Sequence, residues 1–187
     1  MLNKVRLIIF VVLVVPALLI GLGAAAYTFI NGKGDIELVA PADADLSYSL
    51  DSGPKGTVKA GGHLKIAVEQ GKHGLELESA YGKAQRTVEV TNGFQHLLVP
   101  ADDNQCFVVL DVSRSHYQYG SKTADKYPTV KARVRSSDIY DLPGSLYFSE
   151  KSLPANLKEG RACNLLVEVE CKHLEKSDSE LMVAMGY

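Results

Sequence analysis

The uncharged apolar run over residues 7–30 constrains this chain more than any other feature. At a rise of ~1.5 Å per residue, a helix of roughly 24 residues is about 36 Å long, which exceeds the ~30 Å hydrocarbon core of a bilayer. Hydrocarbon offers the backbone no hydrogen-bond partners, so a segment that crosses it must be helical. The run therefore predicts a single transmembrane helix over residues 7–30, after a short cytosolic tip over residues 1–6.

The charges that flank this run predict its orientation. Lys4 and Arg6 precede it, and the next cation along the chain is Lys33. Because basic residues favour the cytosolic side, we expect the N-terminus inside and everything after residue 30 outside. Tyr27 and Phe29 suit the far interface, where aromatic rings accumulate. The expected location is the cytoplasmic (inner) membrane, with a periplasmic or other extracytoplasmic C-terminal region.

A cleaved secretory signal is the alternative interpretation of the same segment. Its basic start, apolar core and three alanines at residues 24–26 resemble a signal peptide with a cleavage site. The apolar run is longer than the usual core of ~7–15 residues, which favours a retained anchor. Both alternatives export the rest of the chain.

Small residues recur every fourth position within the apolar run. Ala17, Gly21 and Ala25 share one face of a helix, and such a face lets a second helix approach closely. This spacing predicts an integral-membrane protein partner, in addition to the lipid bilayer itself.

Beyond residue 34 the sequence alternates apolar and polar residues with the period of a half-buried strand. The clearest runs lie at residues 75–78, 87–90, 130–135 and 166–170. Turn signals rich in glycine separate them, which predicts a mainly β region of one or two small antiparallel β-sandwich domains. We expect a flexible linker over residues 31–34, a first domain over residues 35–100 and a second over residues 101–187. A capping-box pattern at residues 177–180 predicts a final helix, although the residues after it also suit a strand.

The three cysteines lie in the exported region, where disulfides persist. If Cys163 and Cys171 share one extended strand, they lie about 27 Å apart at ~3.4 Å per residue. A disulfide needs Cα atoms within ~7 Å, so these two cannot pair with each other. Cys106 could therefore pair with either Cys163 or Cys171, and three reduced thiols remain the alternative.

Composition and motifs argue against several classes of function. The formal net charge of -2 brings no basic patch for nucleic acid. No two of the five histidines have metal-ligand spacing, so we expect no metal site and no cofactor. Since no nucleophile motif is present, we expect no catalytic residues.

One polar, tyrosine-rich segment lies between two predicted strands. It contains His116, Tyr117, Tyr119 and Tyr127. Long loops on a β-scaffold often bind ligands, and tyrosine supplies a rigid surface for stacking on sugar rings. The alternative is a hairpin whose tyrosines pack back onto the sheet.

Residues 34–99 resemble the PEGA family of small extracytoplasmic β-domains. The resemblance rests on short motifs: GDIEL at 34–38, PADA at 41–44, LSYSLD at 46–51, GKHGLEL at 71–77, YG at 81–82, and TVEV at 87–90 before NG at 92–93. It implies a surface-binding or scaffolding module and carries over no catalytic residues.

These expectations combine into one functional hypothesis. The chain is expected to be a non-enzymatic, single-pass membrane subunit or scaffold of a larger envelope complex, with its helix packed on partner helices and its β region in contact with extracytoplasmic partners. The alternative is a membrane-anchored module that binds a ligand, such as cell-wall glycan, through the tyrosine-rich loop.

Overall fold

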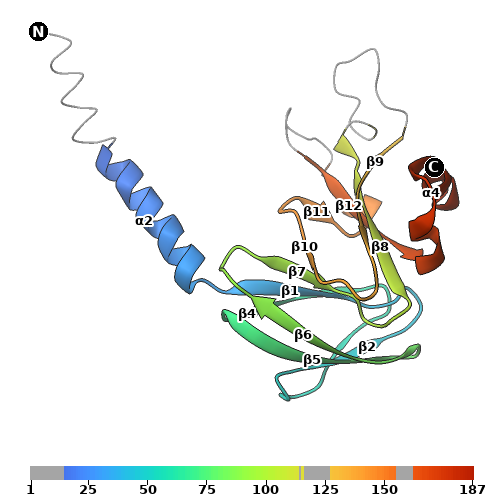
Figure 1. Ribbon diagram of the computed structural model, residues 1–187, viewed down its shortest axis with the longest axis horizontal. Coiled ribbons are helices and arrows are strands. Elements are labelled where there is room, and N and C mark those ends of the chain that lie inside the picture. Colours follow the sequence, from blue (N-terminus) through green and yellow to red (C-terminus); the bar gives the residue numbers. More distant parts are fainter. Residues whose placement is uncertain (1–14, 114, 116–126, 155–161) are drawn as a thin grey trace, which may run out of the picture.

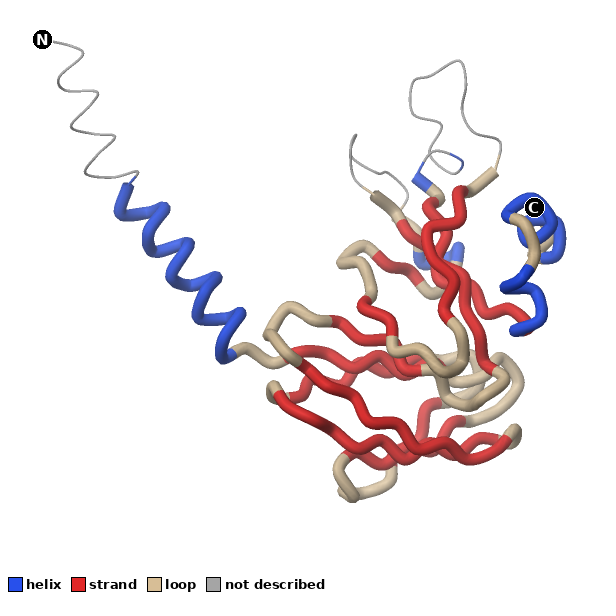
Figure 2. Tube along the Cα trace, in the orientation of Figure 1, coloured by secondary structure: helices blue, strands red, loops and turns tan. Residues whose placement is uncertain are grey.

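The computed structural model describes residues 15–113, 115, 127–154 and 162–187. One long helix leads into a mainly β body that carries a short helix at its C-terminal end (Figures 1 and 2). The elements are α2 (Val15–Asn31), β1 (Gly34–Val39), β2 (Leu46–Leu50), β3 (Gly56–Val58), β4 (His63–Val68), β5 (Gly71–Ser79), β6 (Gly82–Val90), β7 (His96–Val99), β8 (Gln105–Asp111), β9 (Thr129–Val134), β10 (Tyr140–Asp141), β11 (Leu146–Tyr147), the 3₁₀ helix η2 (Glu150–Ser152), β12 (Asn164–Glu170), the 3₁₀ helix η3 (Cys171–Glu175) and α4 (Asp178–Ala184).

Helix α2 occupies the later part of the predicted transmembrane run and carries no acidic residue in its first turn or basic residue in its last. Residues 7–14 of that run, together with Lys4 and Arg6, lie outside the described residues. Within the portion of the chain that is described, no helix combines the length and the apolar character needed to cross a bilayer.

Two four-stranded sheets pack face to face in the first half of the β body. The first sheet has the strand order β10-β7-β1-β4, and the second sheet has the order β3-β2-β5-β6. Strand β5 shows why they pack: Leu75 and Leu77 are buried, whereas Glu76 and Glu78 on the other face are exposed or half-exposed. Ile36 and Leu38 of β1 meet them in one shared apolar core.

The third sheet, with the order β11-β12-β8-β9, covers the other face of the first sheet. A second apolar cluster joins the two, with Leu98 from β7 against Phe107 and Val109 from β8. The far side of the third sheet is covered in turn by Leu174 of η3 and Leu181 of α4. Since β8 is buried on both faces, its residues 106–110 are continuously apolar and do not alternate with polar residues.

The prediction of a mainly β chain built from small antiparallel sheets is confirmed, although β1 with β7 and β11 with β12 form parallel pairs. Strand β10 lies beyond the predicted domain boundary at residue 100, yet it pairs with β7 of the first sheet. The first sheet thus contains strands from both predicted domains. The division into domains 35–100 and 101–187 stays a prediction.

The C-terminal segment forms a helix, which decides between the two alternatives for residues 177–187. The Ser177 hydroxyl accepts a hydrogen bond from the backbone N–H of Glu180, and the Glu180 carboxylate accepts one from the backbone N–H of Ser177. This reciprocal capping box satisfies donors that would otherwise be unpaired at the start of α4.

Candidate functional site

Helix α2 has an exposed apolar surface. Figure 1 shows the helix standing away from the β body, and its large apolar side chains are exposed, with Ile20 73% and Tyr27 69% accessible. Apolar surface left in water costs about 25 cal/mol per Å². The described part of the β body leaves this apolar surface uncovered.

The small-residue face of α2 is open along its length. Ala17, Gly21 and Ala25 are all exposed, and a Cβ atom added at Gly21 would meet no atom within 4 Å. The same holds for Gly23, which lies about 200° away around the helix. The structure therefore presents both glycines freely, but only Gly21 lies on the face shared with Ala17 and Ala25.

Hydrogen bonds tie the end of α2 to the β body. The Gln70 side-chain amide donates to the carbonyl oxygens of Phe29, at 3.0 Å, and Gly32, at 3.1 Å. An ion pair between Lys33 and Glu69, at 2.9 Å, bridges the same two segments. The sequence predicts a flexible linker over residues 31–34, but helix α2 continues through Asn31 and β1 begins at residue 34. Only two residues join them, and these contacts restrain both.

A buried carboxylate joins three strands of the first sheet. Glu37 is 1% exposed on β1, between two histidines from the neighbouring strands. Its oxygens lie 2.7 Å from Nδ1 of His63 and 2.8 Å from Nε2 of His96. The ring of Phe148, beyond β11, stacks on His63 with 4.0 Å between centroids.

This arrangement crosslinks strands and does not leave a reactive group free. Each oxygen of the Glu37 carboxylate accepts one imidazole N–H, so both are already engaged. Among the described residues, no group of three or more histidine, cysteine or acidic side chains has a geometry that could hold a metal ion. We infer a structural role for Glu37, His63 and His96.

His73 has a comparable role at the turn after β2. Its Nδ1 lies 2.8 Å from a carboxylate oxygen of Asp51, and its Nε2 lies 2.8 Å from the carbonyl oxygen of Glu69. Both partners only accept hydrogen bonds, so both contacts are satisfied when the ring is protonated and donates from both nitrogens. The hydrogen bond to Asp51 raises the pKa of His73, and the same bond lowers the pKa of the Asp51 carboxyl.

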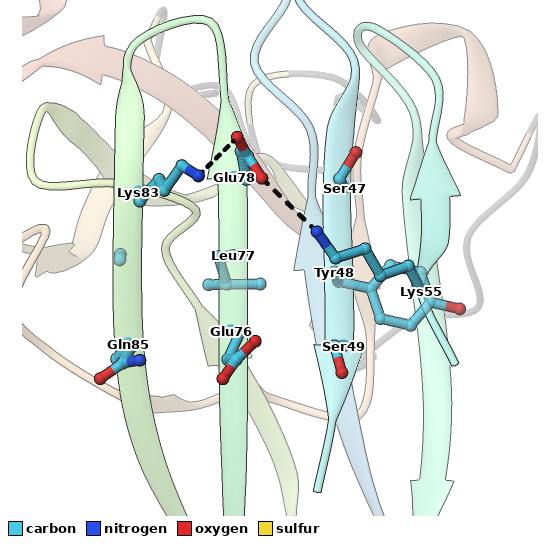
Figure 3. Close-up of a pocket in the computed structure, with 10 residues that line it drawn as sticks. Ser47, Tyr48, Ser49, Lys55, Glu76, Leu77, Glu78, Lys83 and Gln85 are labelled. Atoms are coloured by element: carbon cyan, nitrogen blue, oxygen red, sulfur yellow. Dashed lines mark ion pairs between the residues drawn. The ribbon is translucent and has the colours of Figure 1, made fainter. Parts of the chain in front are cut away.

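The outer face of the second sheet has a shallow polar hollow of about 160 Å³. Figure 3 shows Lys83 and Lys55 reaching Glu78 from either side, at 3.0 and 3.8 Å. Ser47 and Ser49 of β2 add hydroxyl groups to the lining. The described lining contains no histidine or cysteine, and both of its lysines pair with Glu78. The hollow can therefore donate and accept hydrogen bonds as part of a solvated binding face.

A second hollow, of about 370 Å³, has acidic side chains from the β1–β2 connection, the β7–β8 connection and β12 in its lining. Burial raises the pKa of the Glu168 carboxyl, and the nearby negative charges of Asp102 and Asp43 raise it further. The Tyr81 hydroxyl donates a hydrogen bond to Asp43. Asp102 accepts one from the Ser79 hydroxyl at 3.2 Å. These bonds tie two of the acidic side chains to the end of β5 and to the turn that follows it.

A disulfide joins Cys106 to Cys171, with 5.1 Å between their Cα atoms. This is one of the two pairings that the sequence allows. Cys163 and Cys171 flank strand β12, Asn164–Glu170, at opposite ends, and Cys163 is buried without a disulfide. The bridge links the start of β8 to η3, and so ties the C-terminal segment to the centre of the third sheet.

The tyrosine-rich loop is the ligand-binding candidate that the sequence predicts. His116, Tyr117 and Tyr119 lie outside the described residues, and Tyr127 at the end of the segment is 47% exposed. Ligand binding through this loop therefore stays a prediction.

Sequence reasoning missed the cluster of Glu37, His63 and His96. In the sequence, Glu37 between Ile36 and Leu38 has the pattern of an exposed position in an alternating strand. The structure shows that this strand is covered on both faces, where a charge requires partners. Comparison with protein-family models, with curated proteins and with solved structures finds no match for this chain. The resemblance of residues 34–99 to PEGA domains thus stays a prediction.

Proposed function

We propose that this chain is a non-enzymatic, single-pass membrane subunit that holds a disulfide-bonded β scaffold on the extracytoplasmic side of an envelope membrane. Helix α2, with residues 7–14 before it, would be the anchor. The β body, including the PEGA-like region over residues 34–99, would contact the extracytoplasmic parts of a larger complex.

The observation that carries this proposal is the uncovered apolar helix at the start of the β body. Leu18, Leu19 and Leu22 are each more than half exposed along α2. A helix that is apolar all round is normally buried in a membrane or in a protein core. Since the described β body does not cover α2, lipid and partner helices are its natural surroundings.

The disulfide supports an exported β body. Disulfides persist in oxidising compartments and are rare in the cytosol. The bridge between Cys106 and Cys171 closes a sequence separation of 65 residues, and a loop of that length corresponds to about 4 kcal/mol of stabilisation in the chain-entropy model. Such a bridge suits a small β scaffold that works outside the cytosol.

The way in which polar groups are used supports a scaffold more than an enzyme. Glu37 and His73, the most notable titratable groups in the β body, are both held by hydrogen bonds that join strands or turns. The hydroxyl and charged groups of the second-sheet hollow lie on an open face. These features fit protein–protein contact through exposed sheet surface.

The proposal is tested by protease access to the outer face of the membrane. Cells that express the full chain with an N-terminal tag are converted to spheroplasts and treated with protease. The proposal predicts loss of the β body and survival of a small tagged fragment in the membrane pellet after a carbonate wash. A full-length chain that is protected until the membrane is lysed would contradict it.

A further inference from the structure

An exposed aromatic side chain lies at the tip of the turn between β6 and β7. Phe94 is 61% exposed. The turn that carries it is held by local bonds: the backbone N–H of Phe94 donates to the Asn92 side chain at 2.9 Å, and the backbone N–H of Thr91 donates to the Gln95 side chain at 2.6 Å. The turn is therefore pre-organised and directs an apolar ring outward.

This ring lies beside the last turn of α2. The centroids of Phe94 and Phe29 are 6.4 Å apart, with the rings tilted by 37°. The backbone N–H of Gly93 donates to the carbonyl oxygen of Phe29 at 3.4 Å, which aligns the turn with the end of the helix. Ile30 and Tyr27 are also exposed. The apolar surface of the helix thus continues onto the β body through Phe94.

The level of Phe94 along the helix corresponds to a membrane interface. If residues 7–30 span the bilayer, about 36 Å of helix ends at Ile30, and its last turn lies where the ~30 Å hydrocarbon core meets the headgroups. Phe29 then sits at that boundary, and Phe94 is fixed next to it. Transfer of an exposed apolar ring from water into this boundary is favourable.

We propose that the β6–β7 turn is a second membrane contact, in which Phe94 inserts into the headgroup–acyl boundary of the outer leaflet beside α2. The inference rests on the proposed function, because it requires α2 to be an anchor. The partner is the lipid surface itself. With the anchor and this turn both engaged, the β body keeps one orientation relative to the membrane and presents the same sheet surfaces outward.

Tryptophan fluorescence tests this contact directly, because the chain contains no tryptophan. Three single-tryptophan variants of the full chain are placed in phosphatidylcholine–phosphatidylglycerol vesicles: Phe94→Trp at the turn, Tyr27→Trp in the helix, and Tyr81→Trp at an exposed turn between β5 and β6. Each is measured with ordinary lipid and with lipid brominated near the headgroup end of its acyl chains.

The expected result is that Phe94→Trp and Tyr27→Trp lose about half of their emission in brominated lipid, because a side chain in the boundary lies within ~5–10 Å of the headgroup level. The Tyr81→Trp emission should not change. If Tyr27→Trp is quenched and Phe94→Trp behaves like Tyr81→Trp, the second contact is refuted and the anchor stands. A Phe94→Trp emission that is blue-shifted but unquenched would also refute it, by placing the ring against protein. If Tyr27→Trp is itself unquenched, the anchor fails, and the second contact fails with it.

Discussion

The side-chain amide of Gln70 donates a hydrogen bond to the carbonyl oxygen of Phe29 across 3.0 Å. Carbonyls in the last turn of a helix have no partner within the helix, and a side-chain donor from the neighbouring turn satisfies this one. The contact joins the segment between β4 and β5 to the end of α2. The end of the helix is therefore hydrogen-bonded to the β body.

The first prediction concerns this junction. Gln70→Ala removes two hydrogen bonds, each worth about 1 kcal/mol, so the junction should open more often. Lys33 is exposed and lies between the two elements, so a loss of about 2 kcal/mol should let trypsin cut after it about thirtyfold faster. Gln85→Ala, on the exposed face of β6, is the matched control and should leave the cleavage rate unchanged. Equal rates in the two variants would show that Gln70 does not restrain the junction.

The second prediction compares two glycines of α2. A Cβ atom added at Gly21 or at Gly23 would meet no atom within 4 Å, so leucine at either position leaves the chain itself undisturbed. Gly21→Leu should hold a partner helix away from the face of Ala17 and Ala25, and should reduce co-purification of partner chains from mild detergent. Gly23→Leu, on the opposite face, should keep the partner. Both should reach normal membrane levels, and identical co-purification would mean that the small-residue face is incidental.

The third prediction concerns the buried carboxylate. Glu37→Gln replaces one acceptor by an amide donor, so one histidine N–H faces a donor inside the sheet. An unsatisfied buried group costs ~1–3 kcal/mol, and the free energy of unfolding in detergent should fall by about that amount. Glu76→Gln is the control on exposed β5 surface, with an expected change within about 0.5 kcal/mol. A Glu37→Gln variant as stable as Glu76→Gln would count against the crosslink.

Sequence patterns identified the strands that have one buried face and one solvent-exposed face. β5 and β6 alternate because their polar sides face solvent, and the alternation marks them without any tertiary information. β8 does not alternate, because the first sheet and the C-terminal helices cover it from both sides. Its burial depends on packing partners that lie elsewhere in the chain.

The contacts made at long range were beyond sequence reasoning for a physical reason. Glu37 lies 26 residues from His63 and 59 from His96, and only the strand order β7-β1-β4 brings them together. The choice of Cys171 over Cys163 likewise depends on register, since β12 places its two ends far apart along β8. The apolar run and the capping box are local signals, and for that reason a single sequence was sufficient to find them.

The fourth prediction is a pH dependence at His73. Because the pKa of His73 is raised in the folded state, its pair with Asp51 stabilises the fold fully at a pH below the unfolded histidine pKa of ~6.5. This contribution is lost as the pH rises through the raised pKa of the folded state. Asp51→Asn, which tolerates the positive φ of 50° at that position, removes the carboxylate. The stability difference between the natural chain and this variant should shrink as the pH is raised from ~6. Unfolding in denaturant across that range measures it, and a difference that grows with pH would contradict the assignment.

The fifth prediction concerns the fate of the N-terminal segment, because the account depends on α2 as a retained anchor that joins the membrane to the β body. The measurement is the intact mass and N-terminal sequence of the mature protein recovered from the membrane pellet after a carbonate wash. We expect residues 1–26 to be retained and the chain to stay in the pellet. A mature chain that begins at Tyr27 and is released into the soluble fraction would contradict the central claim.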